Sequence, residues 1–266
     1  MFKVTGVLLL SFVAVISAAS INNVLKESKG GRIAGGERPN EDVNMPYQVA
    51  LFTARDDIYY CGGSILNRRW IVTSGVCAIG KSPADVIVFV GSDRLSVGGQ
   101  RHVVDRIVLH PNFDVSVYAN DVAVMRVWIP FAFNENVQPI AMRAEPVVGE
   151  AEALISGFGR QTISDSTTPD LLRFLRVNLI SNEECADEFD DAYTERLFDN
   201  TVCSAGVEGR GTCIGDAGGP LVHDGELIGV ISWGVPCGLG LPDVYARISN
   251  HRGWILVHTM LPESVE

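Results

Sequence analysis

The sequence predicts an all-β protein, built as a barrel or a sandwich, with a helix at its C-terminal end. Short segments rich in β-branched and aromatic residues recur along the chain, and Gly, Asn, Asp and Pro separate them. Helical periodicity is scarce, and the chain contains 27 glycines. The length of 266 residues is enough for one large domain or for two small lobes.

The expected strands follow one another at short intervals. They cover residues 47–52, 70–73, 86–90, 102–109, 122–127, 152–156, 172–179, 221–222, 227–233 and 244–248. Two other stretches favour helices. Residues 181–197 have Ser181 as a candidate N-cap and Glu184 to close a capping box. Residues 250–261 place apolar side chains at helical spacing, which predicts a terminal amphipathic helix.

The first 32 residues are expected to be processing signals. Lys3 precedes an apolar run over 7–16, and the small residues 17–19 suit signal peptidase. An uncleaved anchor is the less favoured alternative, because the run is short for a membrane span. We therefore expect a signal peptide over 1–19 and a secreted, extracellular protein. Residues 20–32 end in Arg32 before Ile33, which suits either a propeptide cleaved by a trypsin-type enzyme or a flexible leader.

Charge and composition limit the partners. The net charge of −11 argues against nucleic acid and anionic membranes, and it suits a cationic partner or simple solubility. Residues 183–199 are dense in acid, either as an exosite for a basic protein or, as we favour, as a solvated helix face. No Cys-x-x-Cys pair or His-rich cluster is present, so no metal is expected. No cofactor is expected either. In a secreted chain the six cysteines predict disulfides, whose pairing the spacing alone does not choose.

Four segments, in order, carry a family resemblance. They are Arg32 with 33–36, 61–64 with 73–77, 120–124, and 215–221 with 232–234. Together they resemble the trypsin and chymotrypsin family of serine proteases over residues 33–266. The resemblance implies a chymotrypsin-like fold of two six-stranded antiparallel β-barrels, over about 33–140 and 141–266, with a C-terminal α-helix. It also implies a monomer and the disulfides Cys61–Cys77, Cys185–Cys203 and Cys213–Cys237.

The chain departs from this family at two positions of the catalytic triad. The family's mechanism uses a Ser nucleophile, a His base and an Asp that orients the His. By resemblance the His position holds Val76, the Ser position holds Ala217, and only Asp121 remains. Because an isopropyl group exchanges no proton and a methyl group attacks no carbonyl, we expect the chain not to be an enzyme. Asp121 is then expected to be structural, accepting hydrogen bonds from backbone N–H groups or Ser232.

Other family features are retained. By resemblance, the N–H groups of Gly215 and Ala217 form an oxyanion hole. Asp216 pairs with the ammonium group that cleavage after Arg32 would create on Ile33, and this ordering would switch the loop.

The resemblance also places a substrate-like pocket. Its base is formed by Gly211 and Thr212, and one wall is formed by residues 232–234, namely Ser232, Trp233 and Gly234. A Gly at the base with Asp243 on the adjacent wall resembles the brachyurin-type enzymes of arthropods. Asp243 would receive a Lys or Arg side chain, or the pocket is vestigial and Asp243 is merely solvated; the sequence favours neither.

Three functions are consistent with these residues. The first is a secreted homologue that acts by binding a protease, a protease substrate or another component of a proteolytic cascade. Haemostasis, complement and innate immunity are the candidate settings, with a salivary or gut origin. The second is a residually active or vestigial digestive endopeptidase, and the third and weakest is a storage or structural protein.

Overall fold

The computed structural model describes residues 33–40, 43–166 and 169–260. The expected signal peptide and propeptide, with Arg32, lie outside these residues. Within them, no helix has the length and apolar character that a membrane span requires.

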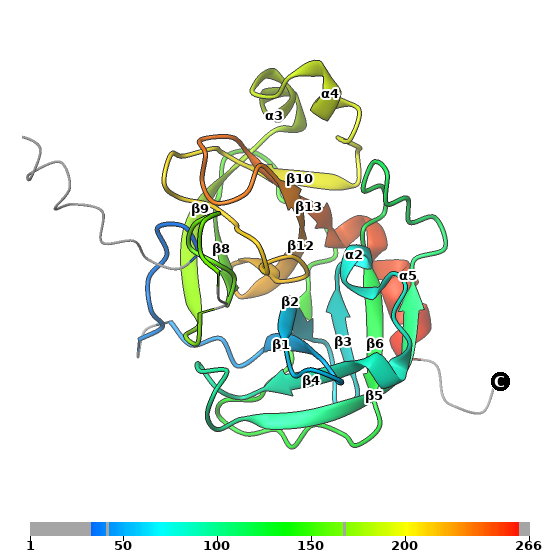
Figure 1. Cartoon of the computed structure of the whole chain (residues 1–266). Helices are drawn as coiled ribbons and strands as arrows, with labels where there is room; N and C mark the ends of the chain where they lie inside the picture. Colours follow the sequence, from blue (N-terminus) through cyan, green and yellow to red (C-terminus); the bar gives the residue numbers. More distant parts are fainter. Residues whose placement is uncertain (1–32, 41–42, 167–168, 261–266) are drawn as a thin grey trace, which may run out of the picture. The chain divides into compact units, whose positions relative to one another are not determined.

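The first barrel is built from strands in which most residues are buried. Six strands close in the order β1-β2-β3-β6-β5-β4, and every pair in it is antiparallel. They are β1 (Gln48–Thr53), β2 (Tyr59–Ile65), β3 (Trp70–Thr73), β4 (Val86–Val90), β5 (Gln100–Leu109) and β6 (Ala123–Val127). Its core includes Leu51, Ile65, Ile71 and Met125, all fully buried. The short helices α2 (Gly75–Ala78) and η1 (Pro83–Asp85) follow β3 (Figure 1).

The second barrel closes in the same way. Its strands run in the order β11-β8-β9-β10-β13-β12, and a pairing between β11 and β12 completes the ring. They are β8 (Glu152–Gly157), β9 (Arg173–Ile180), β10 (Thr201–Ser204), β11 (Pro220–His223), β12 (Glu226–Gly234) and β13 (Asp243–Arg247). The two-residue strand β7 (Ala141–Met142) adds to β12 in parallel. Two barrels confirm the predicted all-β, chymotrypsin-like fold class.

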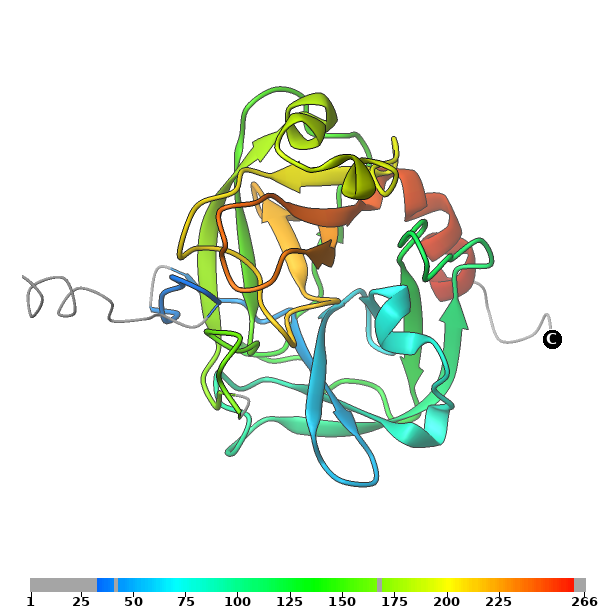
Figure 2. The same ribbon diagram turned by 45° about the horizontal axis from the view of Figure 1, so that its top comes forward.

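The C-terminal helix α5 (Ile248–Met260) packs where the two barrels meet. Ile248 and Ile255 share a buried cluster with Trp70 and Val124 of the first barrel and Val230 of the second. Figure 2 shows α5, in red, alongside strands of both barrels. The expected helix over 250–261 is therefore present and begins two residues earlier.

The expected helix over 181–197 is wrong as a single element. The structure has two short helices instead, α3 (Asn182–Asp187) and α4 (Asp191–Thr194). The capping box holds, since Glu184 N–H donates to Ser181 Oγ at 3.1 Å and Ser181 N–H to Glu184 Oε2 at 2.8 Å. The break follows from packing: Phe189 is buried between the helices, and Asp190 is extended and begins α4.

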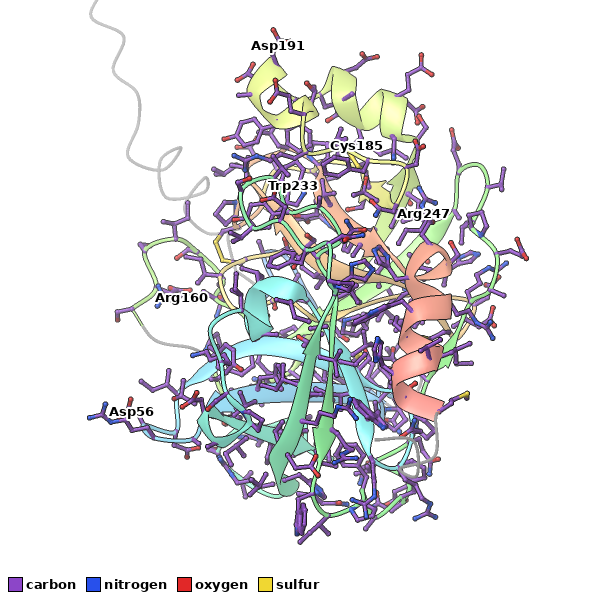
Figure 3. All side chains as sticks on the ribbon, turned by 90° about the vertical axis from the view of Figure 1, so that its right-hand side faces the viewer. Asp56, Arg160, Cys185, Asp191, Trp233 and Arg247 are labelled. Atoms are coloured by element: carbon purple, nitrogen blue, oxygen red, sulfur yellow. A yellow bond between two sulfur atoms is a disulfide. The ribbon has the colours of Figure 1, made fainter. Side chains whose placement is uncertain are left out.

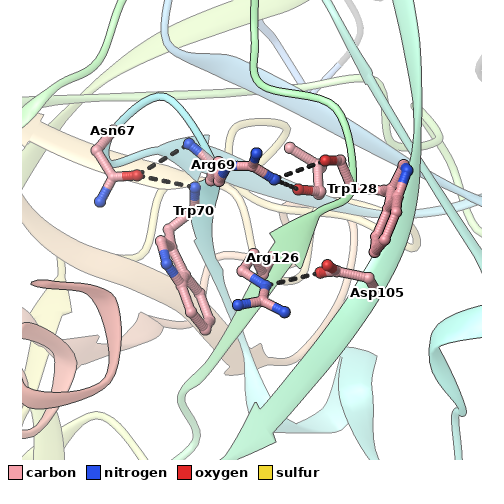
Figure 4. Close-up of polar contacts among 7 residues, drawn as sticks. Asn67, Arg69, Trp70, Asp105, Arg126 and Trp128 are labelled. Atoms are coloured by element: carbon pink, nitrogen blue, oxygen red, sulfur yellow. Dashed lines mark hydrogen bonds and ion pairs between the residues drawn. The ribbon is translucent and has the colours of Figure 1, made fainter. Parts of the chain in front are cut away.

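A side-chain turn starts the strand that leads to α2. Asn67 Oδ1 accepts from the backbone N–H groups of Arg69 at 2.9 Å and Trp70 at 3.0 Å (Figure 4). This Asx turn reverses the chain between β2 and β3. Arg69 then donates to the Trp128 carbonyl at 2.6 Å, which ties the turn to the end of β6.

The two barrels are joined by contact of backbone on backbone. Gly62 N–H, in β2, donates to the carbonyl oxygen of Ala217 at 2.8 Å. A Cβ on Gly62 would lie 2.9 Å from Cα of Gly219, and one on Gly218 would lie 2.5 Å from the Gly62 oxygen. These distances are shorter than real Cβ contacts, so the junction admits only glycine.

Candidate functional site

The six cysteines form three disulfides. They are Cys61–Cys77, Cys185–Cys203 and Cys213–Cys237, the pairing that the family resemblance implies. The first ties β2 to α2, and the third ties the segment before Gly215 to the segment after β12. Both therefore fix backbone at the candidate site.

Asp121 is a buried carboxylate that its own chain satisfies. The side chain is 1% exposed. Its Oδ1 accepts from Val76 N–H at 2.8 Å, and its Oδ2 accepts from Ser232 Oγ at 2.6 Å. Burial raises its pKa to about 6, although these hydrogen bonds oppose the rise.

The other two triad positions carry aliphatic side chains. Val76 lies in α2 and Ala217 in the loop before β11, and both pack against the core of the first barrel. Among the described residues, the hydrogen bonds of Asp121 involve no histidine. The structure thus joins Val76 to Asp121 through a backbone N–H, and it packs Val76 and Ala217 against the same core.

The loop that carries the predicted oxyanion hole is contacted by a side chain from β2 of the first barrel. Gly215 has φ of 100°, which favours glycine. Its carbonyl oxygen accepts from the Tyr59 hydroxyl at 2.7 Å. Within the described part of the chain, neither the Gly215 nor the Ala217 N–H donates to a protein acceptor. Sequence analysis missed Tyr59, because its partner lies 156 positions away and no local pattern announces it.

Asp216 is buried among backbone groups. It is 0% exposed, and it accepts from Gly159 N–H and Cys213 N–H, both at 2.9 Å. A Cβ on Gly157 or on Gly159 would overlap its carboxyl group. Burial raises its pKa to about 7, and Asp243 adds to the rise. Two glycines within the run 157–159 are a pattern that indicates a close approach to the backbone. This pattern was not included in the sequence-based prediction.

Ile33, the expected new N-terminus, is fully buried. Its side chain belongs to the core cluster of the second barrel together with Ile155 and Tyr245. The next residue, Ala34, bridges to Gly211, whose N–H donates to the Ala34 oxygen at 3.1 Å. The activation segment and the predicted pocket base are thus directly hydrogen-bonded.

The predicted pocket residues gather around Asp243. Its carboxyl group accepts from Thr212 N–H at 2.8 Å and from Thr212 Oγ1 at 2.5 Å. Gly211 and Gly234 lie on either side, since a Cβ on either would come within 2.9 Å of a carboxyl oxygen. Asp243 is 6% exposed and burial raises its pKa to about 6, so it is not a solvated surface group.

The wall over residues 232–234 has a free edge. Trp233 and Gly234 pair with Val244 and Asp243 of β13 on one side. On the other side, the pairing of β11 with β12 ends at Val230. Across the described residues, no strand covers 232–234 on that second side.

The acidic run lies on the surface around α3 and α4. All eight carboxylates between 183 and 199 are exposed. No group of three or more His, Cys, Asp or Glu side chains among the described residues is arranged to hold a metal ion.

Comparisons with known proteins give the family. A family model described as Trypsin matches residues 33–255. Trypsin beta of Drosophila erecta is 33% identical over 251 residues, which are 94% of this chain and 97% of that protein. Trypsin 5G1 of Aedes aegypti is 36% identical over 240 residues, 88% of this chain and 86% of that protein. Trypsin alpha of Drosophila melanogaster is 32% identical, with 94% and 96% covered.

These relatives correct one expectation. Val76 and Ala217 led to the prediction that the chain is not an enzyme. That prediction is wrong, because the relatives of the chain are named trypsins. The aliphatic side chains at 76 and 217 are features of this chain within an enzyme family. The match over 33–255 and the two barrels place the chain in the trypsin family of serine proteases.

Proposed function

We propose that this chain is a secreted trypsin-family protein whose role rests on binding an extended segment of another protein. Through that binding it modulates a proteolytic cascade, in haemostasis, complement or innate immunity, as a salivary or gut protein. Residues 1–19 are its signal peptide, residues 20–32 its propeptide, and the mature chain is a monomer.

The observation that carries this proposal is the free edge over 232–234. An extended peptide adds to such an edge through main-chain hydrogen bonds, and side-chain pockets then supply specificity. The Gly215 and Ala217 N–H groups, which donate to no acceptor among the described residues, add two further donors for a bound peptide. Three disulfides support an oxidising, extracellular setting.

The test is calorimetric titration of the mature chain with a panel of extended peptides, each paired with a copy N-methylated at alternate backbone nitrogens. Binding of the parent peptides and loss of binding on N-methylation support the proposal. Equal affinity for both members of each pair contradicts it, because edge pairing requires the N–H groups. Affinity capture from haemolymph and from vertebrate plasma then identifies the bound protein.

A second candidate is a digestive endopeptidase, and the names of the relatives favour it. Hydrolysis of the same peptides, followed by mass spectrometry, separates the two. If the rate of peptide hydrolysis is proportional to the concentration of the chain and persists after the chain is purified again, the second candidate is supported. If the peptide is recovered intact after it has saturated the chain, the first candidate is supported.

Cleavage after Arg32 is proposed to order the loop over 211–217. Among the described residues, the buried Asp216 carboxylate has backbone donors and no cationic partner, so a new ammonium group on Ile33 would stabilise it. Limited trypsin treatment with N-terminal sequencing and hydrogen exchange tests this step. Cleavage before Ile33 without any change in protection over 211–217 contradicts it.

A further inference from the structure

Three histidines gather around one tryptophan where α5 meets the loop over 110–122, which joins β5 to β6. The rings of His110 and His251 lie 5.4 Å apart between centroids, with their planes inclined by 82°. The ring of Trp254 lies 4.9 Å from that of His110 and 4.9 Å from that of His258. Trp254 also packs against the buried cluster that joins α5 to both barrels. We call the three histidines the imidazole cluster.

His251 carries its proton on Nδ1. This atom lies 2.8 Å from the backbone oxygen of Arg247, and a carbonyl oxygen can only accept. Figure 3 labels Arg247 at the start of α5. The other ring nitrogen, Nε2, is buried without a hydrogen-bond partner, and the residue is 3% exposed. A second proton would give this ring a buried, charged donor without an acceptor, which is costly, so the site suits only the neutral ring.

His110 uses the lone pair of Nδ1 to hold the start of the loop. Asn112 N–H donates to this nitrogen at 3.3 Å. The Asn112 oxygen in turn accepts from Nδ2 of Asn120 at 3.0 Å, and Asn120 directly precedes Asp121. A proton on Nδ1 of His110 would set one donor against another and break the first of these bonds. The protonation of His110 is therefore linked through two hydrogen bonds to the residue before Asp121.

The surroundings of the imidazole cluster disfavour its charged form. Burial lowers the pKa of all three histidines, that of His110 to about 4. The positive charges of the neighbours act in the same direction, since His251 and His258 lower the pKa of His110, and Arg106 of β5 lowers that of His258.

The carboxylates on the elements around the imidazole cluster are bonded elsewhere. Those elements are the loop over 110–122, β5, β6 and β12. The hydrogen bonds are from Ser116 to Asp114, from Val76 and Ser232 to Asp121, from Arg126 to Asp105 and from Arg143 to Glu226. The other charged groups at α5 are the cations Arg247 and Arg252. Among the described residues, no carboxylate lies within ion-pair distance of the cluster, so a proton taken up there finds no counter-charge.

We propose that the imidazole cluster is a pH-sensitive switch, which fastens the loop over 110–122 to α5 while its rings are neutral and releases that loop when they take up protons. The segment that leads to Asp121 is then held at neutral pH and loosened in acid. In the released loop a histidine binds its proton at the ordinary pKa of 6.5, so falling pH favours release. The switch requires neither a bound peptide nor cleavage after Arg32, and its test is independent of the proposed function.

The first experiment determines the two tautomers by nitrogen NMR of the histidine rings in the full wild-type chain at pH 7.5. We expect His110 to carry its proton on Nε2, because Nδ1 accepts from Asn112, and His251 to carry its proton on Nδ1. Both rings should be neutral. The opposite tautomer at either ring, or a ring that is already charged, overturns the proposal.

The second experiment measures hydrogen-exchange protection factors at pH 7 and pH 4.5. The readouts are Asn112 N–H and Val122 N–H, which donates to the Asn120 oxygen at 2.8 Å. In the wild type both factors should fall about tenfold or more in acid. His110→Asn offers an amide oxygen in place of Nδ1 and takes up no proton, so its factors should fall less than about threefold. No fall in the wild type, or an equal fall in the variant, overturns the proposal.

A second histidine serves as the matched control. His223 lies on the second barrel, with Nδ1 2.8 Å from the Glu152 oxygen and Nε2 3.2 Å from the Asp224 carboxylate. His223→Gln should leave both protection factors as in the wild type, and a change equal to that of His110→Asn overturns the proposal. Asp121 also titrates in this range, with its pKa raised to about 6, but it is present in every chain compared. The tautomer measurement needs only the wild type, so it decides the matter if His110→Asn does not fold.

Discussion

Asp121 and Asp216 are two buried carboxylates at one site, and they are held in different ways. Asp216 accepts two hydrogen bonds and Asp121 accepts two or more, and burial raises the pKa of Asp216 to about 7 and that of Asp121 to about 6. Asp121 receives one of its bonds from a side-chain hydroxyl, that of Ser232. Asp216 receives both from the backbone and is packed against Gly157 and Gly159.

This difference indicates where in the site a residue can be substituted without disrupting the structure. The surroundings of Asp121 depend on the side chains of other residues, and the residue at 76 contributes only its backbone N–H. Asp216 is surrounded by main-chain groups, and its carboxyl group occupies space that Gly157 and Gly159 leave open because they have no side chains. A substitution should therefore be tolerated near Asp121 and disruptive near Asp216.

The largest expected effect comes from restoring a partner to Asp121. In the chain cleaved after Arg32, Val76→His with Ala217→Ser supplies a base and a nucleophile beside a carboxylate that is already in place. We expect kcat/KM for a fluorogenic peptide to exceed that of either single variant by about 10⁴-fold or more, because such groups act as a unit.

Activity assays of both single variants and of the double variant measure this effect. A double variant that binds peptide but turns it over no faster than the singles would show that the 211–217 loop is not set for catalysis.

The next effect tests the packing against Asp216. Gly159→Ala would place a methyl group within the carboxyl group, and it should lower the free energy of unfolding by about 1–3 kcal/mol. Gly253→Ala is the matched control, because no atom lies within 4 Å of the new Cβ on α5. It should raise stability by about 0.5–1 kcal/mol, since alanine is the better helix former. Denaturant unfolding measures both, and two changes of the same sign would contradict this account.

The two carboxylates should also differ in their effect on stability as the pH changes. A raised pKa means that the folded state holds the proton more tightly, so this stability is complete below the ordinary pKa of 3.8 and is lost as the pH rises through the folded value. In the uncleaved chain, Asp216→Asn should reduce the loss of stability that occurs as the pH rises to about 7. Asp121→Asn should reduce the loss that occurs as the pH rises to about 6.

Unfolding midpoints between pH 4 and pH 8 provide the measurement. His110 acts in the opposite direction: burial lowers its pKa to about 4 in the folded chain, so its protonation favours the unfolded chain as the pH falls. The wild-type minus variant difference removes that contribution. Parallel curves for wild type and Asp216→Asn would contradict the prediction.

The smallest effect concerns the tyrosine that holds Gly215. Tyr59→Phe removes the donor to the Gly215 carbonyl and should cost about 0.5–1.5 kcal/mol of stability. Its neighbour is the control: the Tyr60 hydroxyl is buried without a partner, so Tyr60→Phe should cost nothing or stabilise. Thermal unfolding distinguishes them, and hydrogen exchange at the neighbouring Asp216 N–H, which donates to the Cys213 carbonyl at 3.0 Å, should rise in Tyr59→Phe only.

Much of this fold could be predicted, because strands such as 70–73 and 86–90 are continuous β-branched and aromatic runs. The strand Tyr59–Ile65 was missed because its two glycines interrupt the apolar pattern, and their purpose appears only where Gly62 meets the second barrel. The helix over 181–197 was overextended because periodicity does not reveal that Phe189 turns inward toward Trp233.

The site was predictable to the extent that a motif marks it. Asp121, Asp216 and Asp243 stand in segments that resemble the family, so each could be placed before the fold was known. Tyr59 could not be placed, because the carbonyl that it contacts lies 156 positions away in the sequence. Val76 and Ala217 were identified correctly as aliphatic, yet the inference drawn from them about enzyme class was overturned by the relatives.

The glycine junction between the barrels has a consequence for how this family is recognised from sequence. Gly62, Gly218 and Gly219 are required because two backbones touch, whereas residue 217 enters that contact through its carbonyl oxygen and packs its side chain against the core of the first barrel. A change of side chain at 217 therefore leaves the backbone contact in place, while a side chain at the neighbouring glycines does not. A sequence signature built on those glycines detects the contact between the two barrels. The catalytic groups have to be examined separately, at the side chains of residues 76 and 217.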